Sequence, residues 1–157
     1  MTIVGLGVAF AAGPVLDGVA GASQWFGGRS VAIVGISAAS LGLALSVWSQ
    51  FAMGSSWRIG VDPAERTALV TGGPFRYVRN PIYTGTVLFM IGLFLLVPNA
   101  ASLIALVVVA VMLDLQVRRI EEPFLAESHG YEYRRYIAEA GRFIPRVSRF
   151  PPRRANR

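Results

Sequence analysis

The residues best suited to chemistry form two groups separated by a long apolar stretch. The first group is the loop 72–85, which combines glycine and proline with aromatic and basic residues. The second is the acidic pair Glu121 and Glu122. Within the loop, Pro81 suits the first position of a helix and Asn80 suits the N-cap before it. A helix N-terminus beside basic and aromatic side chains predicts a binding site for a small charged molecule.

The two groups could together hold a ligand with several kinds of functional group. A carboxylate of the acidic pair could accept hydrogen bonds from ribose hydroxyls or from an amine. Backbone amides around 81–83, at the helix N-terminus, could hold a carboxylate. The rings of Phe75, Tyr77 and Tyr83 could pack on a flat heterocycle or on a sulfonium cation. A zwitterionic, aromatic and positively charged ligand would satisfy all of these groups.

Composition predicts that these groups belong to an all-α integral membrane protein. Hydrophobic residues make up 54% of the 157 residues and charged residues only 15%, whereas a soluble domain carries about 25% charged residues. There is no cysteine, which excludes disulfides, thiolate metal sites and cysteine nucleophiles. All 15 basic residues are arginines and they avoid the long uncharged runs. This distribution indicates membrane orientation and contact with lipid headgroups, with no nucleic-acid partner.

The pattern of uncharged runs predicts about four transmembrane helices. Residues 1–22 are the weakest candidate, because they contain Pro14, Asp17 and several glycines. Residues 30–57 are uncharged and long enough for a span, and their small residues would let another helix approach closely. Residues 58–70 predict a short amphipathic surface element.

A tight helical hairpin is expected between the two functional groups. Residues 80–113 carry no charge and are too long for one span. Pro98 and Asn99 divide them, which predicts helices over about 81–97 and 100–117. The hairpin returns the chain to the side that it left, so the loop and the acidic pair are expected on the same side.

Arginines near both ends of the hairpin predict the orientation. Arg76 and Arg79 precede it, and Arg118 and Arg119 follow it. The positive-inside rule places this side in the cytoplasm. We therefore expect a multi-pass protein of the cytoplasmic (inner) membrane whose active site and C-terminal helical segment are cytoplasmic. Asp114 is expected to pair with Arg118, four residues later on the same helix face.

Two motifs in this order resemble the isoprenylcysteine carboxyl methyltransferase and phospholipid methyltransferase superfamily of membrane enzymes. The first, at 69–83, reads Leu-Val-Thr-Gly-Gly-Pro-Phe-Arg-Tyr-Val-Arg-Asn-Pro-Ile-Tyr, and the second is Glu-Glu-x-x-Leu at 121–125 followed by Gly-x-Glu-Tyr-x-x-Tyr at 130–136. The resemblance covers about residues 54–145, and neither motif would suffice alone. It implies one membrane domain, with N-terminal spans at 1–57, a methyltransferase-like core at 58–145 and a basic tail at 146–157.

The resemblance implies an S-adenosylmethionine-dependent enzyme that methylates a lipophilic or lipid-delivered acceptor, through a carboxylate, an amine or a thiol. The implied cofactor-binding residues are Leu69, Val70, Phe75, Tyr77, Asn80, Pro81, Ile82, Tyr83, Glu121 and Glu122. Arg118 or Arg119 would lie near the acceptor, and both are candidate catalytic residues. No metal is implied. Asn80 stands where the prenylcysteine enzymes typically have histidine and the phospholipid relatives often have asparagine, which disfavours a prenylcysteine acceptor.

Other interpretations remain open. The arginines of the loop could serve only as a membrane anchor, and the acidic pair could be surface charges bound to Arg118. A non-catalytic helical scaffold or carrier subunit would use Gly35, Ala39 and Gly42 to bind partner helices. A membrane reductase of related C-terminal architecture would bind a nicotinamide cofactor, and we rank it last because such enzymes have more spans.

Overall fold

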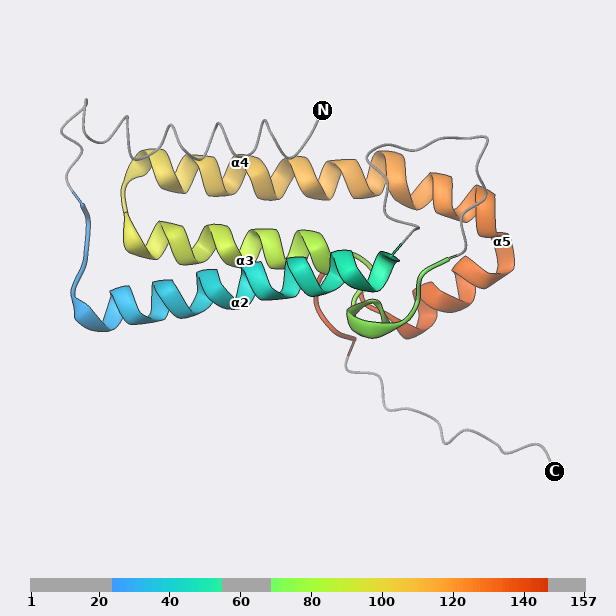
Figure 1. The fold of residues 1–157 in the computed structure, drawn as a ribbon. Coiled ribbons are helices and arrows are strands. Elements are labelled where there is room, and N and C mark those ends of the chain that lie inside the picture. Colours follow the sequence, from blue (N-terminus) through green and yellow to red (C-terminus); the bar gives the residue numbers. More distant parts are fainter. Residues whose placement is uncertain (1–23, 55–68, 147–157) are drawn as a thin grey trace.

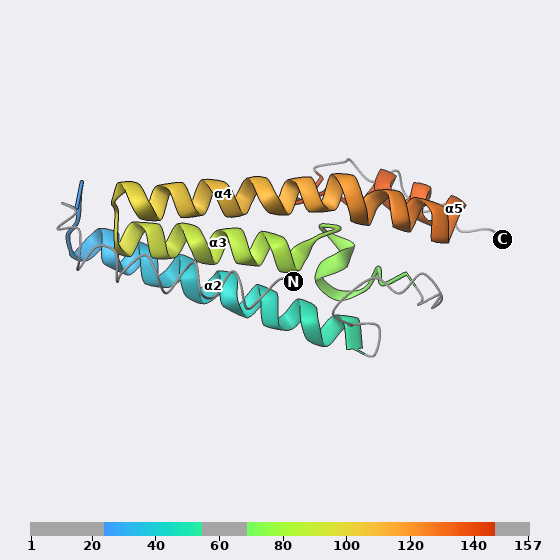
Figure 2. The same cartoon turned by 90° about the horizontal axis from the view of Figure 1, so that it is seen from above.

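The computed structural model describes residues 24–54 and 69–146, and these ranges form an all-α fold. Helices α2, α3 and α4 run side by side, with α3 between the other two, and α5 folds back at one end of this layer (Figures 1 and 2). The elements are α2 (Arg29–Met53), the 3-10 turn η2 (Gly73–Arg76), α3 (Pro81–Leu96), α4 (Ala100–Gln116), the π-helical turn η3 (Val117–Glu121) and α5 (Glu122–Glu139).

The predicted hairpin is confirmed, with both helices ending within one residue of the expected positions. Asn99 caps α4, because its side chain accepts a hydrogen bond from the Ser102 amide at 2.8 Å. The Ser102 hydroxyl in turn accepts from the Asn99 amide at 3.2 Å, which completes a capping box. Pro98 and Asn99 are buried, and the Pro98 carbonyl accepts a hydrogen bond from the Trp25 amide at 2.9 Å.

Glycines bring the backbones of α2 and α3 into direct contact. A Cβ atom placed on Gly42 would lie 2.5 Å from the carbonyl oxygen of Gly85, and one placed on Gly92 would lie 2.6 Å from that of Gly35. Real Cβ atoms do not approach so closely, so only glycine fits. In a bilayer the hydrophobic effect does not drive helices together, and small residues let them associate through close van der Waals contact. The expected close approach to 30–57 is therefore confirmed, and the neighbouring helix is α3 of the same chain.

The remaining contacts form two small cores. One lies between α3 and α4, where Met90, Val109 and Leu113 are buried and Tyr83 packs against them. The other lies beneath the loop 72–85, which we call the polar loop. It consists of Tyr133, Tyr136 and Ala140, with Leu69, Leu125 and Ile137 packed against them. The second core attaches α5 to the segment that leads into α3.

The outer faces of α2 and α4 expose many large apolar side chains. They include Ile33, Leu41, Leu43, Phe51, Ile104, Val107, Val108 and Met112. By length and composition, α2 and the continuous helical stretch Ala100–Glu139 could each cross a membrane. At 16 residues α3 is shorter, about 24 Å against a hydrocarbon core of about 30 Å.

Of the other predicted elements, two lie wholly or mostly outside the described residues, one is shorter than expected, and one is confirmed with interruptions. The weak first span, 1–22, lies outside the described residues, as does most of the amphipathic element 58–70, so the total of about four spans stays a prediction. The second span ends at Met53, short of the expected Trp57. A helical segment after the hairpin is confirmed, but it is interrupted twice, by the turn η3 and by a kink at Gly130 with φ 49° and ψ −110°.

The glycine contact predicts that Gly42→Ala destabilises the fold although alanine is the better helix former. Helix propensity alone would stabilise this variant by about 1 kcal/mol, whereas overpacking costs about 1–3 kcal/mol. Thermal unfolding in detergent should show a lower midpoint. Gly72→Ala is the matched control, since Gly72 has φ −89° and nothing within 4 Å of the added Cβ. A raised midpoint for Gly42→Ala would contradict the contact.

Candidate functional site

The polar loop and the acidic pair meet at the end of the helical layer opposite the Pro98 turn (Figure 1). The Tyr83 hydroxyl, in the first turn of α3, donates a hydrogen bond to Glu121 Oε1. Beside it, Arg79 Nη2 lies 3.1 Å from Glu122 Oε1. Two segments separated by the whole hairpin thus form one polar site, and the expected meeting of the two groups is confirmed.

A third residue, Gln116, joins the contact between Tyr83 and Glu121. Its Nε2 donates to the Tyr83 hydroxyl oxygen and to Glu121 Oε1, both at 3.0 Å. We call these three side chains the Tyr83 network. It connects the start of α3, the end of α4 and the turn η3.

The π-helical turn explains why Glu121 faces this network. Residues i and i+5 lie about 140° apart around an α-helix, with 3.6 residues per turn. A π turn is wider, because its hydrogen bonds run from i to i+5, and it brings such residues nearer to the same side. Gln116 and Glu121 are five residues apart across η3. The turn therefore directs the Glu121 carboxylate toward Gln116 and Tyr83.

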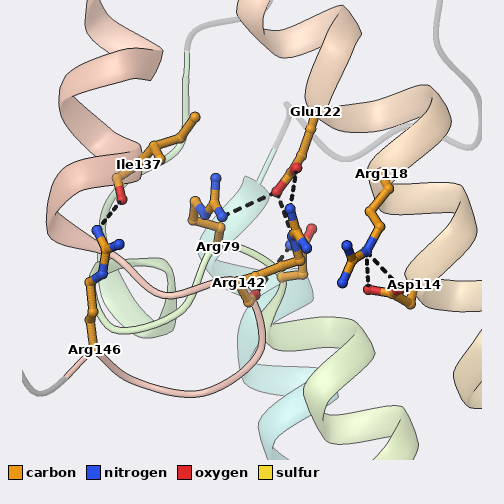
Figure 3. Close-up of polar contacts among 8 residues, drawn as sticks. Arg79, Asp114, Arg118, Glu122, Ile137, Arg142 and Arg146 are labelled. Atoms are coloured by element: carbon orange, nitrogen blue, oxygen red, sulfur yellow. Dashed lines mark hydrogen bonds and ion pairs between the residues drawn. The ribbon is translucent and has the colours of Figure 1, made fainter.

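Glu122, the second acidic residue, is bound by two arginines (Figure 3). Arg142 forms a bidentate pair with it, Nε to Oε1 at 2.8 Å and Nη2 to Oε2 at 2.7 Å, and Arg79 contacts Oε1. The side chain of Arg79 is only 10% exposed. Hydrogen bonding to Glu122 raises the pKa of Arg142, so this arginine stays charged. Glu122 thus has a structural role, and its predicted contact with a cofactor stays a prediction.

The segment 140–146 is held along the polar loop by backbone hydrogen bonds. The Arg79 amide donates to the Gly141 carbonyl at 2.7 Å, and the Asn80 amide donates to the Arg142 carbonyl at 3.1 Å. Val78 and Gly141 form an isolated parallel bridge. Asn80 occupies the N-cap position of α3 as predicted, but its side chain forms no cap. Its Nδ2 donates instead to the Arg142 carbonyl at 3.2 Å.

The other loop residues of the predicted site lie at different depths. Phe75 is buried, and its carbonyl accepts a hydrogen bond from the Tyr136 hydroxyl at 2.6 Å. Leu69 packs on the core beneath the loop. Pro81 is buried at the first position of α3, and Tyr77 is 58% exposed. Val70 and Ile82 are partly buried.

The two candidate catalytic arginines lie apart from the Tyr83 network. Arg118 Nε lies 2.8 Å from Asp114 Oδ1, which confirms the expected pair (Figure 3). The interpretation in which Arg118 binds the acidic pair is wrong, because the arginines on Glu122 are Arg79 and Arg142. Arg119 is exposed. Within the described ranges, neither Arg118 nor Arg119 forms a hydrogen bond to the network, and their catalytic role stays a prediction.

Sequence reasoning missed two residues of the site. Gln116 ends the apolar run of α4, and a lone amide at that place was the available signal. Arg142 gave no local signal, because its role depends on the return of the chain after α5. Among residues 24–54 and 69–146, no three histidine, cysteine, aspartate or glutamate side chains are grouped as they would be around a metal ion.

Comparison with known proteins agrees with this geometry. A family model described as phospholipid methyltransferase matches residues 31–132, a range that includes nearly all of α2, the hairpin and the whole Tyr83 network. The chain belongs to the phospholipid methyltransferase family. Together with the apolar helices, this membership indicates a membrane protein.

A curated relative carries the other name of the superfamily. The protein-S-isoprenylcysteine O-methyltransferase A of Arabidopsis thaliana is 30% identical over 90 residues, which cover 57% of this chain and 46% of the relative. The match thus spans about half of the relative's length. The two comparisons confirm the resemblance that the two motifs indicated.

The ion pairs predict that Glu122→Gln destabilises the fold, because Arg79 would keep a buried charge without its partner. Loss of one partner from a buried pair costs about 3–5 kcal/mol, and the partial exposure here reduces this to about 2 kcal/mol. Denaturant or thermal unfolding in detergent measures the difference.

The matched control is Glu139→Gln. Its partner Arg135 and Glu139 itself are exposed by 73% and 63%, so the change should cost less than about 0.5 kcal/mol. Equal effects of the two substitutions would show that the Glu122 pairs contribute nothing particular to the fold.

Proposed function

We propose that this protein is an integral membrane methyltransferase that uses S-adenosylmethionine and methylates a lipophilic or lipid-delivered acceptor. The Tyr83 network carries the proposal, since it joins the two motifs of the family at the N-terminus of α3. Family membership supports the methyl-transfer reaction. The cofactor and the acceptor class are our inference from the groups that the site presents.

The carboxylate of Glu121 fits the hydroxyl or amine groups of such a cofactor. Tyr83 and Gln116 both bind Oε1. Within the described part of the chain, no residue forms a hydrogen bond to Oε2. A carboxylate oxygen without a partner can accept hydrogen bonds from ribose hydroxyls or from an ammonium group.

The start of α3 fits the carboxylate of the cofactor. Pro81 occupies the first position, and the side chain of Asn80 does not cap the helix. The amide hydrogens of a first helical turn have no acceptor within the helix, and the macrodipole adds positive potential there. Glu121 and this helix end thus present complementary charge to the two ends of a zwitterion.

The bound cofactor would supply a methyl group on a sulfonium, and transfer is an in-line displacement by the acceptor. The protein's own contribution is to bind and align the two molecules and to exclude water, which can supply most of the rate. Glu121, Tyr83 and the α3 N-terminus would hold the cofactor. Tyr77, exposed in the loop, offers a ring face to it. Arg118 and Arg119 remain our candidates for contact with the acceptor.

The surroundings of the site support an acceptor delivered by the membrane. The apolar outer faces of α2 and α4 expose large side chains over much of their length, as lipid-facing helices do. The acceptor group itself is a carboxylate, an amine or a thiol on a lipophilic molecule. Asn80 binds the chain segment after α5, so a structural task accounts for this residue and it does not decide between acceptors.

We further propose that the site faces the cytoplasm from a multi-pass protein of the inner membrane. Arg79, Arg118 and Arg142 all lie at the end of the helical layer that carries the Tyr83 network (Figures 1 and 3). An excess of arginine marks the cytoplasmic side of membrane proteins.

The proposal predicts that the protein in lipid nanodiscs binds S-adenosylhomocysteine, and that Glu121→Gln weakens binding at least tenfold. Hydrogen bonds to a charged group contribute about 1.5–3 kcal/mol. Isothermal titration calorimetry measures both affinities, and Glu139→Gln, on the exposed face of α5, should bind like the wild type. Labelled S-adenosylmethionine supplied to membranes that contain the protein should then label a lipid-soluble product. No binding by the wild type would refute the proposed function.

A further inference from the structure

Gln116 is the member of the Tyr83 network for which neither motif provides a role. We propose that Gln116 is a positioning residue, which orients the carboxylate of Glu121 so that one oxygen faces the methyl donor. The inference rests on the proposed function, because it assigns a task within the same site. Three hydrogen bonds carry it.

The chemistry of the three groups determines the direction of these bonds. An ionised carboxylate only accepts hydrogen bonds, so the amide of Gln116 must present its NH2 group to Glu121. The same NH2 group donates to the Tyr83 hydroxyl oxygen. The Tyr83 hydrogen is then directed at Glu121 Oε1. Gln116 therefore also sets the orientation of the tyrosine hydroxyl.

Both donors bind the same carboxylate oxygen. Oε1 of Glu121 accepts hydrogen bonds from Tyr83 on α3 and from Gln116 on α4. Two donors from different helices restrain rotation of the carboxylate. Within the described residues Oε2 has no hydrogen-bond partner, and this is the oxygen that would bind the ligand. A group held in its bound orientation before binding loses less entropy when the ligand arrives.

The position of Gln116 in the chain suits this task. It is the last residue of α4 and precedes the π turn, so its side chain lies where the helix register changes. In a uniform α-helix, Glu121 would lie on a different side from Gln116. The turn and the glutamine thus act together: the turn brings the carboxylate near, and the amide determines its orientation.

Among the described residues, most charged groups around Gln116 are already engaged, and Arg119, three residues later, is exposed. Glu121 faces it from η3 and Tyr83 faces it from α3. Asp114, on α4 itself, is paired with Arg118. At the start of α5, Glu122 is paired with Arg79 and Arg142. A new acidic group at position 116 would therefore act first on Glu121.

The test compares Gln116→Met with Gln116→Glu, and uses S-adenosylhomocysteine as the probe in nanodiscs. Gln116→Met keeps the length of the side chain and removes its donors, so binding should weaken about tenfold at every pH between 5 and 9. The unfolding midpoint without ligand should stay close to that of the wild type. Gln50→Met, near the end of α2 and outside the network, is the matched control and should bind normally.

Gln116→Glu provides a readout that a packing role would not give. At low pH the new carboxyl is protonated and can still donate to Glu121, so affinity should be close to that of the wild type. As the pH rises the carboxyl ionises, and two like charges side by side disfavour the ionised pair. Affinity should therefore fall with pH, relative to the profile of the wild type.

Two results would overturn the inference while leaving the proposed function intact. One is wild-type affinity in Gln116→Met. The other is a loss of affinity in Gln116→Glu that does not depend on pH. Failure of the wild type itself to bind the probe would refute the proposed function, so the two failures are distinguishable.

Discussion

The ion pairs of Glu122 join three segments of the chain. Glu122 is the first residue of α5. Its carboxylate forms an ion pair with Arg79 of the polar loop, and it accepts two hydrogen bonds from the guanidinium group of Arg142, in the segment after α5. A partly buried carboxylate between two arginines is stable only while all three groups keep their positions, because a charge left without a partner away from water is costly. The polar loop, α5 and the returning segment are therefore one unit. The Tyr83 network lies next to this unit, because Glu121 directly precedes Glu122 in the chain.

A different interaction positions this unit on the helical layer. The glycines of α2 and α3 bring two backbones together, and the Ser46 hydroxyl donates to the Ile82 carbonyl at 3.2 Å. The first turn of α3 thus has a fixed place relative to α2. The same contact weighs against a scaffold role, since Gly35, Ala39 and Gly42 are already covered by α3 and are not available to a partner helix.

The sequence was sufficient for the parts of the fold that depend on local patterns. The hairpin followed from an uncharged run with Pro98 and Asn99 at its middle, and the ends of its helices were predicted within one residue. The meeting of Tyr83 with Glu121 followed from the hairpin, because a chain that turns back must bring its two polar ends together. The Asp114 pair with Arg118 followed from helical spacing.

The parts that the sequence did not reveal depend on contacts between distant segments. The preference of asparagine for the N-cap predicted that the Asn80 side chain caps α3. In the structure this side chain binds the backbone carbonyl of Arg142 instead. Glu121 and Glu122 are adjacent and chemically identical, and only the π turn and the returning segment give them different tasks. Arg142 could not be paired with Glu122 without knowing that α5 kinks at Gly130 and brings the chain back. These contacts join residues that are far apart in the sequence, so local sequence patterns do not predict them.

The close contact between α2 and α3 leaves no room for a hydrophobic molecule to pass between these helices. Where a single added methyl group would collide with the opposite backbone, an acyl or prenyl chain has no passage. That face of α3 is therefore sealed along the stretch from Gly85 to Gly92, and the two helices behave as one wall. The lipophilic acceptor that we propose would therefore reach Glu121 by a route that does not pass between α2 and α3.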